Sequence, residues 1–255
     1  MDVETPMKKM LLVLTIALVA ASATAAVAQT ADEVIDKALA AQGGRDALTK
    51  IRSRAMNGTI ALSTPAGDVT GTIEVWNKTP NKSRTLIKLD LSQFGAGPVA
   101  IDQRFDGAAG YVIDPLQGDR DLSGNQLQNL KNGAFPSPFL DYKARGVTMK
   151  LLPAEKVLGH DAIVLQMTPT SGSPVKNYFD AESYQLMRTV VTVNVPQINA
   201  DVESTVDFSD YRTVDGVKVP FVTKLSSSVQ NYTVTLSSVG HNVEIDDKTF
   251  AKPDK

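Results

Sequence analysis

The 255-residue sequence contains no cysteine, only two histidines and a single tryptophan. The absence of cysteine excludes disulfides, thiol catalysis and thiolate metal sites. The two histidines, His160 and His241, lie far apart in the chain, without the helical spacing of ligands that a metal site requires, so we expect no metal. No G-x-S-x-G turn or other catalytic arrangement is present. The sequence therefore predicts neither an enzyme nor a bound cofactor.

A strong charge of either sign is also missing. Lys and Arg total 26 and Asp and Glu total 28, which gives a formal net charge of −2. No cluster of Lys and Arg marks a surface for nucleic acid, so this class of partner is excluded. The composition is that of a globular protein, with 42% hydrophobic and 21% charged residues. A protein of this size without disulfides must be held together by a sizeable apolar core.

The only long hydrophobic run lies at the N-terminus. The basic pair Lys8-Lys9 precedes an apolar run, and small residues follow up to Ala28. This order is typical of a Sec-type signal peptide. The alternative is a membrane anchor, but the run is shorter than the roughly 20 residues that a spanning helix needs. We therefore expect residues 1–28 to be cleaved after Ala28, leaving an exported chain of residues 29–255, which the resemblance described below implies is a single periplasmic domain.

The mature chain opens with its one strong helical pattern and then changes to the pattern of β-strands. Thr30 can cap a helix within residues 30–50, and Asp32 and Glu33 suit its first turn. From Arg52 onward, apolar and polar residues alternate, as in half-buried strands. Strand-like runs cover residues 53–63, 68–77, 83–91, 98–105, 109–114, 146–152, 161–168, 175–180, 186–195, 203–211, 217–226 and 231–244. The predicted fold class is mainly β (α+β), with a curled antiparallel sheet of about eleven strands that forms a barrel or an incomplete barrel plugged by helices.

One segment, residues 121–145, interrupts the strands. Ser123 opens a short helical pattern with Leu127, Leu130 and Ala134 on one face. An insertion of this length is often a lid or a binding loop. The alternative is a helix that simply fills one open end of the barrel. Both interpretations place the segment beside a cavity.

Short motifs of aromatic, Asp-Gly and Pro residues punctuate the mature chain. The first two are Gly71-x-x-x-x-Trp76-x-x-x-Pro80 followed by Leu86-Ile87-Lys88-Leu89, and Asp106-Gly107-x-x-x-Tyr111-x-x-x-Pro115. The later ones are Tyr178-Phe179-Asp180-x-x-x-Tyr184-x-Leu186, Asp210-Tyr211-Arg212-x-x-Asp215-Gly216-Val217-x-Val219-Pro220 and Asp246-Asp247-x-x-Phe250-x-x-Pro253. In their order and spacing, these motifs resemble those of the LolA-like superfamily, the periplasmic carriers that sort lipoproteins to the outer membrane.

The resemblance implies a half-open barrel around the N-terminal helix, a short helical lid, and an apolar cavity for acyl chains. Inward-facing residues of alternating strands would line the cavity: Ile60, Leu62, Ile73, Val75, Leu86, Phe105, Val112, Ile163, Leu165, Val191 and Val193. Residues of the lid or rim would be Leu39, Trp76, Lys78, Thr79, Leu127 and Leu130, with core packing as the alternative for Trp76. The implied partners are a lipid or an acylated lipoprotein, with an envelope protein as a second class and only peripheral or transient contact with a membrane.

One position departs from the family pattern. The carriers usually have an arginine directly before the proline of the first motif, where it binds the lid. Here that position is Thr79, and Lys78 lies one residue earlier. The resemblance therefore implies a protein that binds a lipid, acyl chain or lipoprotein in outer-membrane sorting, without the carriers' gating scheme. The alternative is a periplasmic protein-interaction or sensor module of the same fold without carrier activity.

Overall fold

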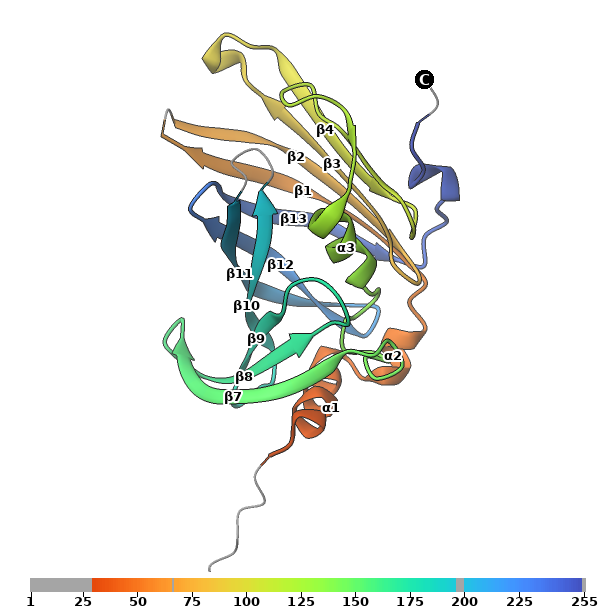
Figure 1. The fold of residues 1–255 in the computed structure, drawn as a ribbon, viewed down its shortest axis with the longest axis vertical. Helices are drawn as coiled ribbons and strands as arrows, with labels where there is room; N and C mark the ends of the chain where they lie inside the picture. Colours follow the sequence, from red (N-terminus) through yellow and green to blue (C-terminus); the bar gives the residue numbers. More distant parts are fainter. Residues whose placement is uncertain (1–28, 66, 196–199, 254–255) are drawn as a thin grey trace, which may run out of the picture.

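A computed structural model describes residues 29–65, 67–195 and 200–253 (Figure 1). The expected signal peptide and its cleavage site lie outside these residues. The predicted N-terminal helix is split into α1 (Ala31–Gln42) and α2 (Arg45–Thr49). Thr30 caps α1 as expected, because its side chain accepts a hydrogen bond from the Glu33 N–H and the Glu33 carboxylate accepts one from the Thr30 N–H. Gly43 ends α1 at φ 127°, a conformation that favours glycine.

All the strands of the described chain form one antiparallel sheet of thirteen strands. They are β1 (Ser53–Thr64), β2 (Gly67–Lys78), β3 (Lys82–Asp90), β4 (Pro98–Phe105), β5 (Gly110–Ile113), β6 (Arg120–Asp121), β7 (Thr148–Val157), β8 (His160–Thr168), β9 (Val175–Asp180), β10 (Leu186–Val195), β11 (Ala200–Val214), β12 (Val217–Ser227) and β13 (Asn231–His241). Helix α3 (Gly124–Asn132) lies between β6 and β7 in the sequence. Two short 3-10 helices are η1 (Ser92–Phe94) and η3 (Asp247–Thr249).

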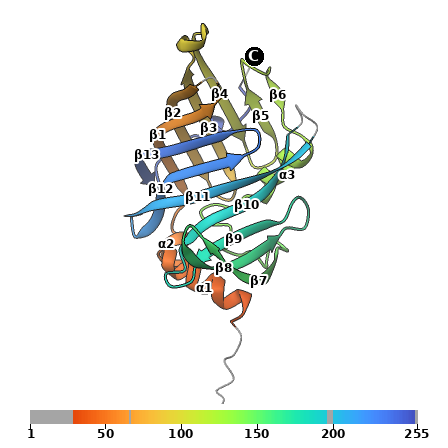
Figure 2. The ribbon, with the colours of Figure 1, turned by 90° about the vertical axis from the view of Figure 1, so that its left-hand side faces the viewer.

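The strand order is β6-β5-β4-β3-β2-β1-β13-β12-β11-β10-β9-β8-β7. Every neighbour is also a neighbour in the sequence except β1 and β13, which pair from Arg54 with His241 to Ser63 with Asn231. The first and last strands therefore meet in the middle of the sheet. The two edges, β6 and β7, are consecutive in the sequence and lie far apart in the curled sheet (Figures 1 and 2).

The pairing register decides which side chains share a face of the sheet. Residues opposite each other in antiparallel strands point to the same side. One row of paired residues crosses eight strands: Leu165, Asn177, Thr189, Val206, Leu225, Tyr232, Leu62 and Val69. Leu165 belongs to the hydrophobic cluster that includes α1. We call this side the inner face and the other side the outer face.

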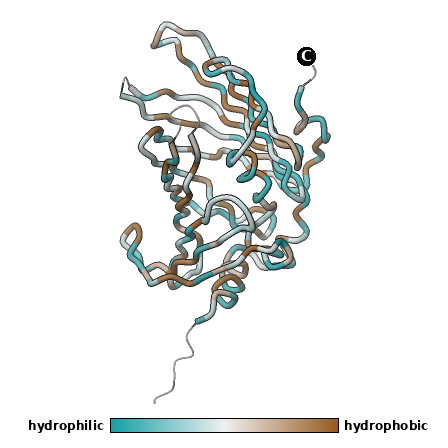
Figure 3. Tube along the Cα trace, viewed as in Figure 1, coloured by the Kyte–Doolittle hydropathy of each residue, from teal (hydrophilic) through white to brown (hydrophobic). Residues whose placement is uncertain are grey.

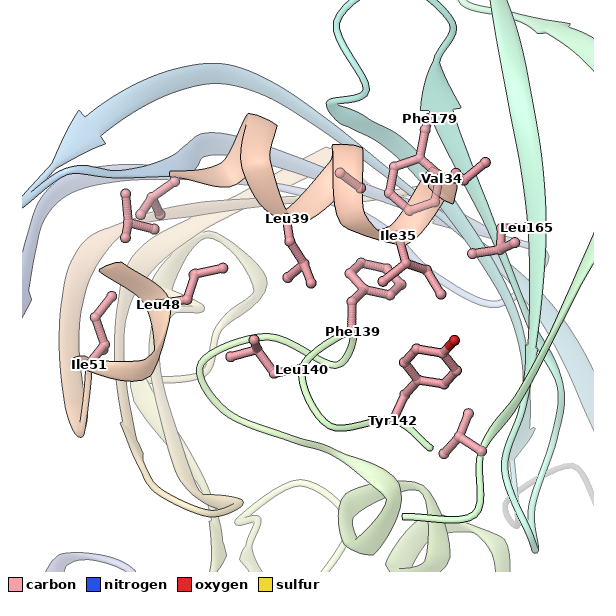
Figure 4. Packing of buried hydrophobic residues seen from close by; sticks show 14 of the residues in the cluster. Val34, Ile35, Leu39, Leu48, Ile51, Phe139, Leu140, Tyr142, Leu165 and Phe179 are labelled. Atoms are coloured by element: carbon pink, nitrogen blue, oxygen red, sulfur yellow. The ribbon is translucent and has the colours of Figure 1, made fainter. Parts of the chain in front are cut away.

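The largest core lies between α1 and the inner face at the β7–β12 end of the sheet (Figure 4). Val34, Ile35 and Leu39 of α1 are at most 1% exposed. They pack in one cluster with Phe139 and Phe179, whose rings meet edge to face with their centroids 5.4 Å apart. Because full burial of each such side chain contributes about 1.5–3 kcal/mol, this cluster accounts for much of the stability of that end.

The outer face of the opposite end is covered by the C-terminal segment, residues 243–253. The Arg104 guanidinium donates a hydrogen bond to the carbonyl of Ala251 in this segment, at 3.2 Å. Asp102, which is 5% exposed, accepts hydrogen bonds from both Arg84 and Arg104. A buried charged network therefore holds the outer sides of β3 and β4 together.

The sequence-based strand prediction is largely confirmed. Each of the predicted runs corresponds to a strand of the structure. The structure has one further strand, β6, which is only two residues long and therefore shows no alternation of apolar and polar residues. The count of about eleven is therefore too low. The sheet is a curled open sheet, and α1 contacts β7 and β12 near one end. The expectation that the barrel wraps around this helix is wrong in that respect, because α1 packs in the cluster at that end, while β1–β4 carry a separate apolar cluster.

Candidate functional site

A second apolar region covers the inner face of β1–β4 and the adjoining part of β13. Ile60, Val69, Ile73 and Leu89 are buried there. Around them pack partly buried side chains: Leu62, Val75, Ile87, Leu91, Ile101, Tyr232 and Val234. We call these eleven residues the β1–β4 apolar face. Along the strands, apolar and polar positions alternate in Figure 3, as expected for strands with one apolar side.

Residues 122–147, which contain α3, form a segment across the open side of the sheet, and we call it the lid segment. Its helix contacts β10. The Phe135 N–H donates a hydrogen bond to the carbonyl of Pro80 at 2.9 Å, which attaches the segment to the β2–β3 turn. Asn132 donates to the carbonyl of Ser171 at 2.6 Å, which attaches it to the β8–β9 turn. The lid segment therefore joins both arms of the curled sheet.

A polar contact attaches the lid segment to α1. The Tyr142 hydroxyl and the Lys143 ammonium both donate hydrogen bonds to the carboxylate of Asp32. These bonds, from Lys143 first and then Tyr142, lower the pKa of Asp32. The side chains of Asp32 and Lys143 are more than half exposed, so salt screens this ion pair. The contact fixes the position of the lid segment relative to α1 but contributes little to the stability of the fold.

Besides a cavity beside Asp32 and Lys143, two cavities adjoin the lid segment. One, of about 350 Å³, lies between the lid segment and the β2–β3 turn and is lined by Thr79, Pro80, Phe135 and Arg145, among others. The other, of about 160 Å³, lies between α1 and strands β9–β12 and is lined mainly by apolar groups, including Phe179, Leu186 and Phe208. Neither cavity is lined by a residue of the β1–β4 apolar face.

The described part of the chain holds neither a cluster of metal ligands nor a membrane-spanning helix. No three His, Asp or Glu side chains of the described ranges gather closely enough to hold a metal ion. Every helix of the described ranges is too short or too polar to cross a bilayer. The distinctive features of the molecule are therefore its apolar inner face and the segment that crosses it.

The sequence matches no family model and no curated protein. Solved structures with the same architecture do exist. A domain described as an outer membrane lipoprotein-sorting protein, from Vibrio parahaemolyticus, gives a TM-score of 0.56 at 14% identity and covers 87% of this chain and 97% of its own. A LolA superfamily protein from Nitrosomonas europaea gives 0.57 at 17% identity, with 88% and 99% covered. The chain has a LolA-like fold.

A third solved structure with this LolA-like fold is a DUF1329 family protein from Desulfovibrio piger ATCC 29098. Its TM-score is 0.55 at 16% identity, and the match covers 87% of this chain and 97% of that one. The three matches each span nearly the whole described chain. The resemblance that the sequence motifs indicated is confirmed at the level of the fold.

The register of the LolA-like sheet places ten of the eleven predicted cavity residues on the inner face. They are Ile60, Leu62, Ile73, Val75, Phe105, Val112, Ile163, Leu165, Val191 and Val193. Four of them, Ile60, Leu62, Ile73 and Val75, belong to the β1–β4 apolar face. Ile163 and Leu165 instead pack with α1, in the core of the other end. That any of them contacts a ligand stays a prediction.

Leu86 is the exception, because it lies on the outer face. It pairs with Glu74 and Asp102, while its neighbour Ile87 pairs with Ile73 and points inward. The residues after Leu86 carry the signal that identifies the correct side. Ile87 and Leu89 alternate with the charged Lys88, so the apolar row of this strand runs through the odd-numbered positions.

Three of the predicted lid or rim residues lie elsewhere. Trp76 is on the outer face, where the Arg84 guanidinium stacks 5.0 Å from its ring centroid. Lys78 is also on the outer face and forms an ion pair with Asp247 at 2.8 Å. Leu39 is a core residue of α1, 1% exposed. These placements follow from strand alternation for the first two and from the apolar stripe of α1 for the third.

The remaining predicted lid or rim residues do lie near the lid segment. Thr79 lines the cavity between the lid segment and the β2–β3 turn. Leu127 and Leu130 are half-buried on α3. Sequence reasoning missed Arg54 and Phe135, which lie against each other with the guanidinium carbon 5.2 Å from the ring centroid. The signal available was that Arg54 stands in the apolar row of β1, two residues before Met56 and six before Ile60.

Proposed function

We propose that this protein is a periplasmic, non-enzymatic carrier that binds a lipid, an acyl chain or the acyl part of a lipoprotein on the inner face of its sheet. The β1–β4 apolar face carries the proposal, because four buried and seven partly buried apolar side chains gather there. Contiguous apolar surface that remains partly exposed is characteristic of binding sites. The likeness of the fold to a lipoprotein-sorting domain supports the same interpretation.

The strength of such binding can be estimated from the methylenes that leave water. Each buried methylene contributes about 0.8 kcal/mol. Contact with ten methylenes would contribute about 8 kcal/mol, which corresponds to a dissociation constant near 1 μM before ordering costs. Burial of the acyl chain itself needs no charge or metal, which agrees with the apolar chemistry of this face.

Native mass spectrometry of the purified protein, with lipid extraction from the same preparation, tests the proposal directly. We expect co-purified lipid, or uptake of a fluorescent fatty acid by the delipidated protein. A protein that is empty and also takes up no fatty acid would contradict carrier function. That outcome would favour the protein-interaction or sensor module of the same fold. Mass spectrometry of the exported protein also tests cleavage after Ala28.

Two adjacent positions on β3 provide a matched pair of variants. Ile87 and Leu86 are both half-buried, but they point to opposite faces of the sheet. Ile87→Glu should weaken fatty-acid binding by at least about tenfold, because a carboxylate would have to lose its hydration next to the acyl chain. Leu86→Glu should leave binding unchanged. Equal effects of the two variants, in folded protein, would locate the ligand elsewhere.

A further inference from the structure

Arg54 occupies an unusual position on the inner face. It pairs with His241 on β13 and shares a side of β1 with Met56 and Ile60. Its Nε donates a hydrogen bond to His241 Nε2 at 2.9 Å, and its guanidinium stacks on the ring of Phe135 from the lid segment. Arg54 therefore lies at the junction of the inner face and the lid segment.

No carboxylate pairs with this arginine. Of the nine arginines in the sequence, six form ion pairs with aspartates: Arg45, Arg84, Arg104, Arg120, Arg188 and Arg212. Arg52 is exposed, and Arg145 donates to backbone carbonyls of the lid segment. Burial lowers the pKa of Arg54 to about 10, since nothing negative offsets the loss of hydration. Arg54 is thus a partly buried cation that lacks an anionic partner among the described residues.

His241 does not supply the missing negative charge. Its side chain is 1% exposed, and burial, with Arg54 adding to the effect, lowers its pKa, so it accepts the bond from Arg54 as a neutral ring. Its Nδ1 lies 3.4 Å from a carboxylate oxygen of Asp215, outside hydrogen-bond geometry. Asp215 is largely exposed and faces the far side of the imidazole ring from Arg54. His241 therefore orients the Arg54 guanidinium without neutralising it.

The two η nitrogens of Arg54 are available for an anion. Neither donates a hydrogen bond to any described residue, while Nε is held by His241. The described chain has a few polar side-chain atoms that are both completely buried and without a hydrogen-bond partner, such as Nε of Arg145. The η nitrogens of Arg54 are not among them, so they are not completely buried. The edge of the guanidinium opposite His241 is therefore accessible. A guanidinium edge of this kind binds the two oxygens of a carboxylate or phosphate in parallel.

The strand that carries Arg54 also leads into the β1–β4 apolar face. Arg54, Met56, Gly58, Ile60 and Leu62 alternate along the same side of β1. The nine residues from Arg54 to Leu62 are separated by eight steps and cover about 27 Å at roughly 3.4 Å per residue. One acyl chain spans half the hydrocarbon core of a bilayer, about 15 Å. The face is therefore long enough for one extended chain that starts at Arg54.

We propose that Arg54 binds the acidic head group, carboxylate or phosphate, of a single-chain amphiphile whose acyl chain lies along the β1–β4 apolar face. This inference rests on the proposed function and specifies its ligand class. Phe135 holds the guanidinium plane from one side and His241 fixes Nε, so the free edge is oriented before the ligand arrives. Such pre-orientation reduces the ordering cost of binding.

The test compares three ligands with the same 16-carbon chain at pH 8: hexadecanoic acid, its methyl ester and hexadecyl phosphate. Displacement of a fluorescent acyl probe gives each affinity. We expect the purified protein to bind the acid, the phosphate or both at least about tenfold more tightly than the ester. A preference for one of the two anions identifies which head group the site accepts. Equal affinity for all three would overturn the inference and leave the proposed function intact, whereas binding of none would overturn both.

Variants assign the preference to Arg54. Arg54→Met should remove the preference for the anions while ester binding persists, which also shows that the variant is folded. Arg54→Lys keeps the positive charge but not the planar guanidinium edge, so it should retain part of the preference for the anions. This variant replaces Arg54→Met in the test if the Met variant does not fold. Arg212→Met is the matched control, because Arg212 also stacks on a ring, that of Phe221, but is exposed and paired with Asp210. A preference that survives in Arg54→Met, or that is lost in Arg212→Met as well, would refute the assignment.

Discussion

Replacing Asp102 by asparagine tests how far the buried network on the outer face stabilises the sheet. Asp102 is 5% exposed and accepts bonds from Arg84 at 2.9 and 2.7 Å and from Arg104 at 3.0 and 2.8 Å. Asp102→Asn removes the only negative charge between two guanidinium groups. It also turns an amide donor toward groups that can only donate. The side chains of Arg84 and Arg104 are 19% and 15% exposed, so water compensates for little of this loss.

The expected loss is that of a broken buried ion pair, about 3–5 kcal/mol. For a domain of this size, that corresponds to a decrease in Tm of roughly 6–20 °C. Urea unfolding gives the loss directly, and the fluorescence of Trp76 is a suitable probe because Arg84 stacks on its ring. A loss below about 1 kcal/mol at pH 7, with an unchanged m-value, would refute the reasoning.

The pH dependence gives a second check on Asp102. Burial alone raises the pKa of this carboxyl, but the hydrogen bonds from Arg84 and Arg104 outweigh burial and hold the pKa below its ordinary value. Wild type should therefore keep its full advantage over Asp102→Asn above about pH 5. The advantage should shrink as the pH falls below about 4 and through the folded-state pKa. An advantage that grows in acid would contradict this sign. Asp210→Asn, which breaks an exposed pair with Arg212, should leave the unfolding midpoint unchanged.

Three further changes test other parts of the fold. Thr30→Ala removes the cap of α1 and should destabilise the protein by about 1 kcal/mol in urea unfolding, whereas Thr30→Ser should not. Gly71→Ala places a methyl group against the backbone of β3 and should cost about 1–3 kcal/mol, with loss of amide protection along β2 and β3 in hydrogen exchange. Hydrogen bonds from Lys78 and then Lys82 lower the pKa of Asp247 to about 2, so Lys78→Met should raise this pKa in an NMR titration. An unchanged value in that variant would contradict the ion pair.

Local chemistry was predictable wherever residue type alone determines the structure. The Thr30 cap, the turn at Asp106-Gly107 and the limits of most strands follow from capping, turn and alternation patterns. The Asp106 carboxylate does accept hydrogen bonds from the N–H groups of Ala108 and Ala109, both at 2.8 Å. Such interactions join residues that are close in the sequence, so the sequence contains the information needed to predict them.

Long-range pairing could not be obtained in the same way. Leu86 is predicted on the inner face but lies on the outer one, because two adjacent apolar residues leave the face undetermined until the partner strands are known. The pairing of β1 with β13 joins residues up to 187 positions apart, as in Arg54 with His241, and no local pattern encodes it. The importance of Arg54 depends on this pairing, because only there does it meet His241. The candidate site could therefore be identified only from the structure, whereas most of the strands could be predicted from the sequence.

The strand order has a mechanical consequence for the lid segment. Residues 122–147 connect β6 to β7, which form the opposite edges of the sheet. The same segment is attached to Pro80 near one arm and to Ser171 near the other. A ligand that spreads the two arms must therefore lengthen the path that this segment spans, and shortening that path brings the arms together. The curvature of the sheet and the position of the lid segment are therefore coupled, so a change that widens the sheet also moves this segment.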